Sequence, residues 1–274
     1  INLDTITSDI MIAAYLVNYN VSDDIAKLAL ELGYDIPNPN KNEDISIEDK
    51  AKIGISKAKF IYETEDLFDK KMQEEGVIDL YNNIELPLSF VLGRMEYTGI
   101  KCDSSVLDKM GLDIRSKVSE IQNSIYDLAG NVFNISSPKQ LGEVLFDKLG
   151  LPHGKKGKSG NYSTDEATLS KLIDYPIIQL ILEYRMLTKL ENTYIEGLKS
   201  NIMADGRIHT IYTQTITATG RLSSIAPNLQ NIPVRNEYGR LIRKSFVSDK
   251  DSVILSSDYS QIELRMFAHL ASID

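Results

Sequence analysis

Apolar residues recur every three or four positions through the middle of the chain, and this pattern predicts a long amphipathic helix. Asp103 or Ser104 supplies the N-cap, and Gly130-Asn131 ends the helix. One face of such a helix packs against a core while the other stays in water. The apolar stripe consists of Leu107, Met110, Ile114, Val118, Ile121, Ile125 and Leu128.

Helix signals are also frequent on both sides of this stripe. Ser137-Pro138 places a capping residue before a proline at the first helical position, and Gly33 ends a helix whose cap lies at 22–24. Polar segments at 35–50 and 154–160 predict loops, and the second of them is basic and glycine-rich. The predicted helices cover 9–17, 24–32, 51–72 and 176–199, with shorter ones starting at 137 and 163.

Strand signals come only toward the end of the chain. Residues 207–217 alternate and are rich in β-branched side chains, which predicts one strand. A second apolar run, 253–257, predicts a buried strand that delivers Asp258 to its end, and a short helical segment follows at 259–270. Helices first and strands later indicate a mixed α+β, mostly helical fold with separate helical and α+β parts.

Composition is that of a soluble globular protein. The chain has 274 residues, 42% of them hydrophobic and 25% charged, and its length allows two domains of about 150 residues each. We expect no membrane segment and no signal peptide, because no apolar run reaches about 18 residues and no basic stretch precedes one. The single cysteine, Cys102, excludes an internal disulfide and indicates a reducing compartment, with a buried thiol as the expected state.

The net charge of −9 is unevenly distributed along the chain. Residues 1–100 carry 9 Lys/Arg and 19 Asp/Glu, whereas residues 131–250 carry 16 and 11. A basic middle behind an acidic front favours a polyanion-facing surface, and ordinary solvated charge is the alternative.

Two segments carry candidate chemistry. Residues 219–235, TGRLSSIAPNLQNIPVR, are dense in hydrogen-bond donors that could reach the minor-groove acceptors present on every base pair; a polar loop that satisfies its own backbone is the alternative. In the second segment, Asp258 could ligate Mg²⁺ with Glu263 nearby, as in sites that catalyse phosphoryl transfer, or it could simply cap the next helix.

Both segments resemble the family A DNA polymerases. The second, DYSQIELR at 258–265, is similar to that family's motif A, and the first is similar to the palm segment that precedes it. The likeness continues back through SPKQLG at 137–142, the 155–163 loop, Tyr184-Arg185 and Tyr194-Ile195 to about residue 86, and more weakly before that. The implied activity is template-directed transfer of a nucleotide from a dNTP to a primer 3′-hydroxyl, in DNA replication or repair.

The resemblance implies roles for the matching residues of the second segment. Asp258 would ligate two catalytic Mg²⁺ ions, with the Tyr259 backbone carbonyl as a further ligand. Glu263, with Gln261 beside it, would form the steric gate that excludes a ribose 2′-hydroxyl. His269 is expected to pack or cap rather than to react.

The resemblance also implies a surface for primer–template duplex. Arg221 would reach the minor groove at the primer terminus. The helices of 104–200 would form a thumb that grips the duplex backbone, although a solvated loop is the alternative for the lysines at its tip. The other implied DNA-binding residues are Asn228, Gln230, Asn231, Arg235, Ser137, Lys139, Lys155, Lys156, Lys158, Arg185 and Lys189.

Three domains follow from the resemblance. Residues 1–83 would be the C-terminal part of a 3′–5′ exonuclease-like domain, degenerate and retained as a platform, with Asp9, Tyr62 and Asp66 as weak matches to its ligands. Residues 84–205 would be the thumb with a connecting helix, and 206–274 a partial palm. We expect a bacterial cytoplasmic, nucleoid-associated monomer whose partners are duplex DNA, dNTP and the remainder of a polymerase chain.

Some expected parts of the family's site are absent from these residues. The fingers helix with its Lys and Tyr is not found after 265, and no histidine precedes an Asp-Glu pair. We therefore expect weak or no Mg²⁺ binding and no polymerase activity from these residues alone. A non-enzymatic duplex-binding module and a nuclease are the competing classes.

Overall fold

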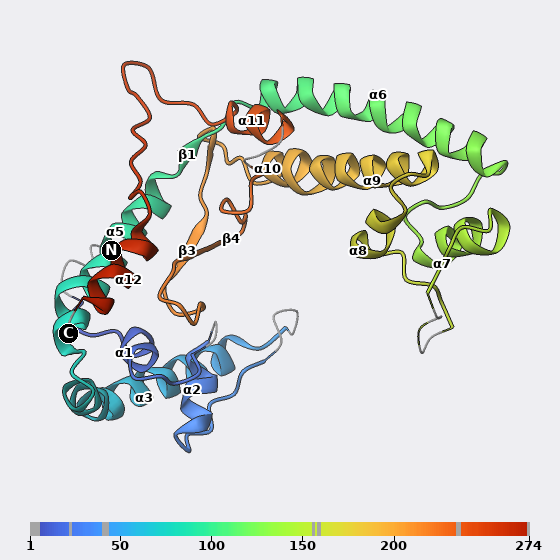
Figure 1. The fold of residues 1–274 in the computed structure, drawn as a ribbon. Coiled ribbons are helices and arrows are strands. Elements are labelled where there is room, and N and C mark those ends of the chain that lie inside the picture. Colours follow the sequence, from blue (N-terminus) through green and yellow to red (C-terminus); the bar gives the residue numbers. More distant parts are fainter. Residues whose placement is uncertain are drawn as a thin grey trace.

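The chain folds into a mostly helical crescent with two small antiparallel sheets (Figure 1). The structure is a computed structural model that describes residues 6–21, 24–39, 44–154, 157, 160–233 and 237–272. In chain order, its elements are α1 (Ile10–Leu16), α2 (Ile25–Glu31), α3 (Ile47–Glu74), α4 (Ile78–Leu80), η1 (Tyr81–Glu85), α5 (Leu86–Thr98), β1 (Ile100–Lys101), α6 (Ser104–Ala129), α7 (Pro138–Gly142), η2 (Glu143–Lys148), α8 (Glu166–Leu169), η3 (Ser170–Leu172), α9 (Pro176–Lys189), η4 (Leu190–Glu196), α10 (Gly197–Lys199), β2 (Arg207–Ile208), β3 (Ile211–Thr213), β4 (Ser223–Ile225), α11 (Glu237–Arg243) and α12 (Ile262–Ala271).

The front region (residues 6–83) packs α1, α2 and α3 around its own core at one end of the crescent. Asp9 and Asp24 cap α1 and α2, because each carboxylate accepts a backbone N–H from the first turn. Helix α3 begins earlier than the predicted residue 51, since the Ser46 hydroxyl caps it by accepting the Asp49 N–H at 3.1 Å. The fully buried side chains here include Leu28, Phe60, Phe68 and Met72.

The arm (residues 104–199) confirms the predicted amphipathic helix. Helix α6 lies along α9, and their facing apolar side chains form the main core (Figure 1). The prediction is wrong for one residue of the apolar stripe. Leu128 is 48% exposed, and the neighbouring Ala129 is buried instead. Leu107, Ile114, Ile121 and Leu128 are spaced by seven, and a straight α-helix drifts by about 20° per seven residues, so the last of them turns away from the core.

The predicted strand at 207–217 divides between the two sheets. Strand β2 pairs with β1, with Ile208 opposite Ile100, and β3 pairs with β4, with Tyr212 opposite Ser224. Side-chain hydrogen bonds hold the chain where it passes from one sheet to the other. The Thr210 hydroxyl lies 2.6 Å from Ser224 Oγ and 2.9 Å from the Ile225 carbonyl oxygen.

The predicted buried strand at 253–257 is wrong. These residues form no strand and are exposed, with Val253 at 87% and Leu255 at 89%. A strand needs a partner for its backbone groups, and among the described residues the two sheets pair only β1 with β2 and β3 with β4. Asp258 therefore lies on an exposed segment that leads into α12, and helix α12 has no buried residue.

Cys102 is buried, as predicted, and this burial raises the pKa of its thiol. Among the described helices, none has both the length and the apolar character needed to cross a membrane.

Candidate nucleic-acid interface

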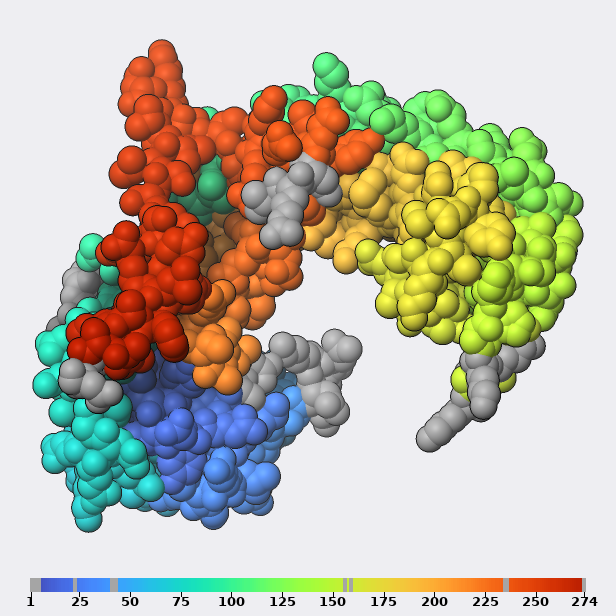
Figure 2. All heavy atoms as spheres, viewed as in Figure 1, coloured from blue at the N-terminus to red at the C-terminus, as the bar shows by residue number. Residues whose placement is uncertain are grey.

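The crescent has a concave face between the arm and the rest of the molecule (Figure 2). The predicted site residues fall into two groups around the crescent, one in the arm and one near the junction of β4 and α12. Four of them, Lys155, Lys156, Lys158 and Arg235, lie outside the described residues.

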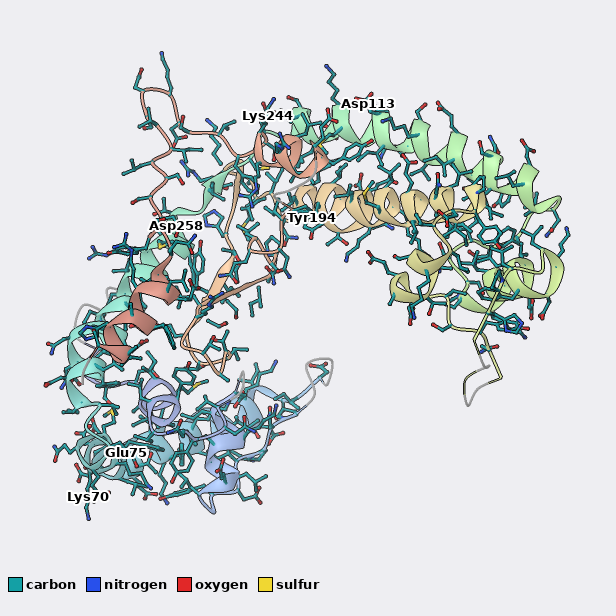
Figure 3. All side chains as sticks on the ribbon, viewed as in Figure 1. Lys70, Glu75, Asp113, Tyr194, Lys244 and Asp258 are labelled. Atoms are coloured by element: carbon teal, nitrogen blue, oxygen red, sulfur yellow. The ribbon has the colours of Figure 1, made fainter. Side chains whose placement is uncertain are left out.

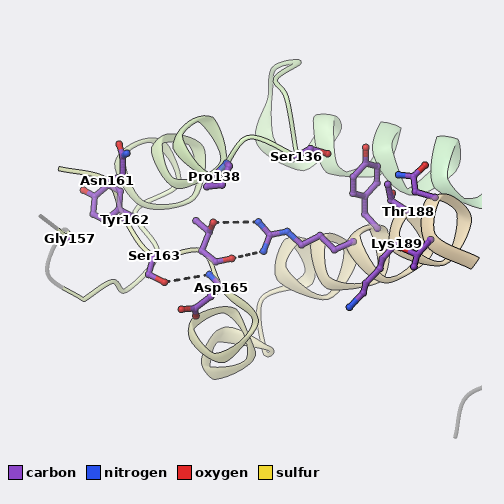
Figure 4. A pocket seen from close by; sticks show the side chains of 14 residues that line it. Ser136, Pro138, Gly157, Asn161, Tyr162, Ser163, Asp165, Thr188 and Lys189 are labelled. Carbon is purple, nitrogen blue, oxygen red and sulfur yellow. Dashed lines mark hydrogen bonds between the residues drawn. The ribbon is translucent and has the colours of Figure 1, made fainter. Parts of the chain in front are cut away.

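The arm contains a pocket of about 950 Å³ between α9 and the segment 160–165 (Figure 4). Polar side chains of α9 and of the segment 161–165 line it together with apolar surface, which is the usual composition of a ligand pocket. The Thr188 hydroxyl is buried in this area without a partner in the described part of the chain. The lining includes Ser136, Tyr184, Arg185, Thr188, Lys189 and Asn192.

Arg185 of α9 is hydrogen-bonded to another segment of the arm. Its guanidinium donates to the Thr164 carbonyl oxygen at 2.5 Å and to Thr164 Oγ1 at 3.4 Å (Figure 4). Burial lowers the pKa of this guanidinium from its ordinary value. Arg185 thus anchors the 160–165 segment to α9, an arrangement that the predicted DNA contact did not anticipate.

Lys189 and Lys139 are exposed cations of the arm, and Lys189 lies at the pocket. At the start of α7, the Ser137 hydroxyl accepts the Gln140 N–H at 3.4 Å, and Pro138 has no N–H to offer. The first three residues of α7 are Pro138, Lys139 and Gln140. Only Lys139 therefore retains a backbone N–H that is unpaired within the described structure, and this N–H could bind an anion.

The second group joins the two candidate segments. Arg221 donates to a Glu263 carboxylate oxygen at 2.8 Å, and both side chains remain largely exposed, at 75% and 71%. Arg221 and Glu263 are 42 residues apart in sequence. The structure therefore brings the donor-rich segment and the segment of Asp258 into direct contact.

Two of the three side-chain amides in the donor-rich segment, those of Asn228 and Gln230, are used by their own loop. Asn228 Oδ1 accepts the backbone N–H groups of Gln230 and Asn231 at 3.0 and 3.2 Å, and Gln230 Nε2 donates to the Leu222 carbonyl oxygen at 3.1 Å. The Asn231 carbonyl oxygen accepts the Tyr194 hydroxyl at 2.5 Å, at the inner end of the arm (Figure 3). For Gln230, the side-chain bond fits the alternative of a polar loop that satisfies its own backbone. The bonds of Asn228 and Asn231 hold the segment in position.

Asp258 and Tyr259 lie in the open, and Gln261 adopts a left-handed backbone, with φ at 55°, immediately before α12 (Figure 3). Among the residues that the structure describes, no three His, Cys, Asp or Glu side chains gather in one place. Asp258 and the Tyr259 carbonyl therefore supply two oxygen donors and no closed metal site. His269 is exposed in the last turn of α12, where its carbonyl oxygen accepts the Ser272 hydroxyl at 3.0 Å.

Sequence reasoning missed residues that act across long sequence distances. Tyr15 contacts the turn before Arg221 from 202 positions away, and Thr164 receives Arg185 from 21 positions away. Neither contact has a local sequence signal, because both depend on how separate elements pack.

Comparison with known proteins agrees with the resemblance. The model of the family described as DNA polymerase family A matches residues 104–274. DNA polymerase I of Lactococcus lactis subsp. lactis is 44% identical over 280 residues, which cover 99% of this chain and 32% of that protein. DNA polymerase I of Bacillus subtilis is 42% identical over 279 residues, which cover 96% of this chain and 31% of that protein.

A solved structure shares the fold over nearly the whole chain. It is the POL domain of Pol1 from M. smegmatis in complex with DNA primer-template and dNTP, with a TM-score of 0.82 and 36% identity. The match covers 97% of this chain and 46% of that one. The chain spans about a third of the length of the curated relatives that it matches. It belongs to DNA polymerase family A.

Proposed function

We propose that this chain is part of a template-directed DNA polymerase, in which it holds the primer–template duplex and contributes the first catalytic carboxylate. The observation that carries this proposal is the 2.8 Å contact between Arg221 and Glu263, which unites the two family-like segments in one exposed site. The structural likeness to a polymerase domain in complex with primer-template and dNTP supports DNA and a nucleotide as its ligands.

Asp258 and the Tyr259 carbonyl are the residues proposed to hold Mg²⁺. Their oxygen atoms are the donors that this cation prefers, and the Asp258 carboxylate has no competing partner in the described structure. When bound, Mg²⁺ supplies Lewis-acid stabilisation of the oxygens of an in-line phosphoryl displacement. One carboxylate is an incomplete ligand set, and we propose that the further ligands come from the remainder of a longer polymerase.

Glu263, with Gln261 beside it, is proposed to face the sugar of the incoming nucleotide. Arg221 contacts the Glu263 carboxylate through an exposed ion pair. Arg221 is in turn proposed to extend a guanidinium to the minor-groove edge of the primer terminus, where purine N3 and pyrimidine O2 are acceptors. A pair that is exposed and not buried can exchange partners when DNA arrives.

The arm is proposed to grip the duplex backbone as a thumb. Lys139, Lys189 and the lysines at 155, 156 and 158 would meet phosphates, which position a duplex without reading its sequence. Arg185 would act mainly by holding the 160–165 segment in place, since its guanidinium is already paired with Thr164.

The three proposed domains keep the boundaries 1–83, 84–205 and 206–274. Two observations support the proposal that the first domain is a degenerate exonuclease-like domain, in which the candidate metal ligands are used otherwise or lie apart. The Asp9 carboxylate is engaged as the cap of α1, where it accepts the Met11 and Ile12 N–H groups at 2.9 and 3.1 Å. Tyr62 is 82% exposed on α3.

The proposal is tested by Asp258→Asn in the full-length protein that carries this chain. Primer extension should fall by on the order of 10²- to 10³-fold, the range observed when one stabilising group is removed from an active site. Asp251→Asn, at an exposed aspartate of the preceding loop, is the matched control and should retain activity. Duplex affinity should persist in both variants, and equal extension by the Asp258→Asn variant and the wild type would refute the assignment.

The competing proposal is a non-enzymatic duplex-binding module, and the exposed cation Lys189 at the arm's pocket favours it. It applies to these 274 residues alone, which we propose lack polymerase activity. Metal-dependent primer extension by the purified chain would contradict that part of the proposal. Duplex binding that weakens steeply with salt would support it.

A further inference from the structure

The turn before Arg221 is held by the front region and by Glu85, which follows that region in η1, and not only by its own sheet. Residues 214–220 leave β3, reach the front region and return to β4. Gln214 Nε2 donates to the Glu85 carbonyl oxygen at 3.0 Å and to Glu85 Oε2 at 2.9 Å. A pocket of about 470 Å³ is lined both by this segment and by residues that follow α1.

Tyr15 of α1 makes the contacts that matter most here. Its hydroxyl donates to the Thr217 carbonyl oxygen at 2.7 Å and accepts the Gly220 N–H at 3.0 Å. These are the first and fourth positions of the turn, which in an ordinary β-turn bond directly to each other. The Tyr15 hydroxyl bonds to both of them, so a group from another part of the molecule ties the two ends of the turn to α1.

The same turn leads directly to Arg221. The Thr217 hydroxyl donates to the Arg221 carbonyl oxygen at 2.5 Å, and Gly220 has φ at +75°, a left-handed conformation that glycine adopts without strain. Arg221 then reaches Glu263 on α12. A continuous set of hydrogen bonds therefore runs from α1 through the turn to the Arg221–Glu263 pair.

We infer that Tyr15 is a positioning residue for the polymerase site, which sets the location of Arg221 by bonding both ends of the Thr217–Gly220 turn. The ring of Tyr15 packs against the front core, so its hydroxyl has a defined position. The front region thereby has a function in polymerisation that does not require nuclease chemistry. This inference rests on the proposed function, because it assigns importance to Arg221 at the primer terminus.

The test uses Tyr15→Phe in the full-length protein, a change that removes the hydroxyl and keeps the ring. The matched control is Tyr34→Phe, the same change in the same region, where the ring packs against Phe60 with centroids 5.0 Å apart. We expect kcat/KM for primer extension to fall about three- to tenfold in the Tyr15 variant, the scale of a hydrogen bond's net contribution, and to stay unchanged in the control. Thermal unfolding of both variants separates this effect from a loss of stability.

A second readout follows Arg221 itself. A primer that ends in 3-deazaguanine lacks the minor-groove N3 acceptor, so the wild type should extend it more slowly than a guanine-ended primer. Tyr15→Phe should reduce that difference, Arg221→Ala should abolish it, and the double variant should resemble Arg221→Ala. A double variant whose losses simply multiply, or a Tyr15 variant with the full wild-type difference, would overturn the inference.

Failure of the proposed function would give another pattern. In that case the wild type extends no primer, or Arg221→Ala extends both primers as the wild type does. A normal Arg221 effect with a silent Tyr15→Phe would refute only the positioning role.

Discussion

At the scale of single residues, hydrogen bonds between distant positions place the polar side chains. His209 is the clearest case, because its Nδ1 lies 2.7 Å from the Glu96 carbonyl oxygen and its Nε2 lies 2.9 Å from Asp205 Oδ2. Gly99 fits beside this ring: with φ at +62°, an added Cβ would lie 2.8 Å from two of the imidazole atoms. The junction of α5 and β1 is therefore shaped around His209.

His209 makes stability depend on pH. The Glu96 carbonyl oxygen and then the Asp205 carboxylate raise the pKa of the imidazole above 6.5, against the opposing effects of desolvation and of Arg207. Because the folded pKa is the higher one, this stabilisation is fully present below the unfolded pKa of about 6.5 and is lost as pH rises through the folded pKa.

Urea unfolding at several pH values checks this prediction. The difference in unfolding midpoint between the wild type and His209→Gln should shrink as pH rises from below 6.5 into the alkaline range. His269→Gln, at the exposed histidine of α12, serves as the control and should show no such trend. A constant difference for His209→Gln would contradict the prediction.

At the scale of elements, the helices follow their local signals and the strands do not. Helix α6 ends at Gly130, in the left-handed conformation, and α7 starts after the Ser137 cap, both as expected. A helix satisfies its own backbone, so caps and periodicity within one segment decide where it forms. A strand depends on a partner, and for this reason 207–217 was divided between two sheets and 253–257 formed no strand.

The contact of α6 with α9 predicts a large difference between two nearby positions. Ile114 is fully buried, whereas Leu112 on the same helix is 65% exposed. Ile114→Ala should lower the free energy of unfolding by about 2–5 kcal/mol through lost burial and the cavity left behind. Leu112→Ala should change it by about 0.5 kcal/mol or less. Chemical denaturation of both variants measures the contrast, and equal losses would show that α6 does not pack as described.

At the scale of the whole molecule, the negative charge gathers in the front region: residues 6–83 hold 8 Lys/Arg and 16 Asp/Glu, whereas the arm holds 12 of each. The acidic front region packs around its own core, while the arm carries the exposed cations Lys139 and Lys189, of which Lys189 lies at the pocket. Arg185 and Lys189 lie in the same pocket, but Arg185 is bonded to Thr164 and Lys189 is exposed. The two cations should therefore contribute differently to DNA binding.

Salt dependence of duplex binding distinguishes these contributions. Lys189→Gln should weaken binding and reduce the slope of log K against log salt by about 0.9, the value for one lost phosphate contact. Arg185→Gln should also weaken binding, because it releases the 160–165 segment, yet leave that slope unchanged. Fluorescence anisotropy of a labelled duplex over a salt series measures both, and a reduced slope for Arg185→Gln would identify it as a direct phosphate contact.

The sequence by itself determined the helices, their caps and the family, because periodicity, capping residues and contiguous motifs are local properties. It also identified Asp258, Glu263 and Arg221 as candidates. Only the tertiary structure decided that Arg221 contacts Glu263, that Arg185 is bonded to Thr164, and that Tyr15 bonds to the turn before Arg221. Those contacts join residues 21 to 202 positions apart, and they exist because separate elements pack together, which no local pattern records.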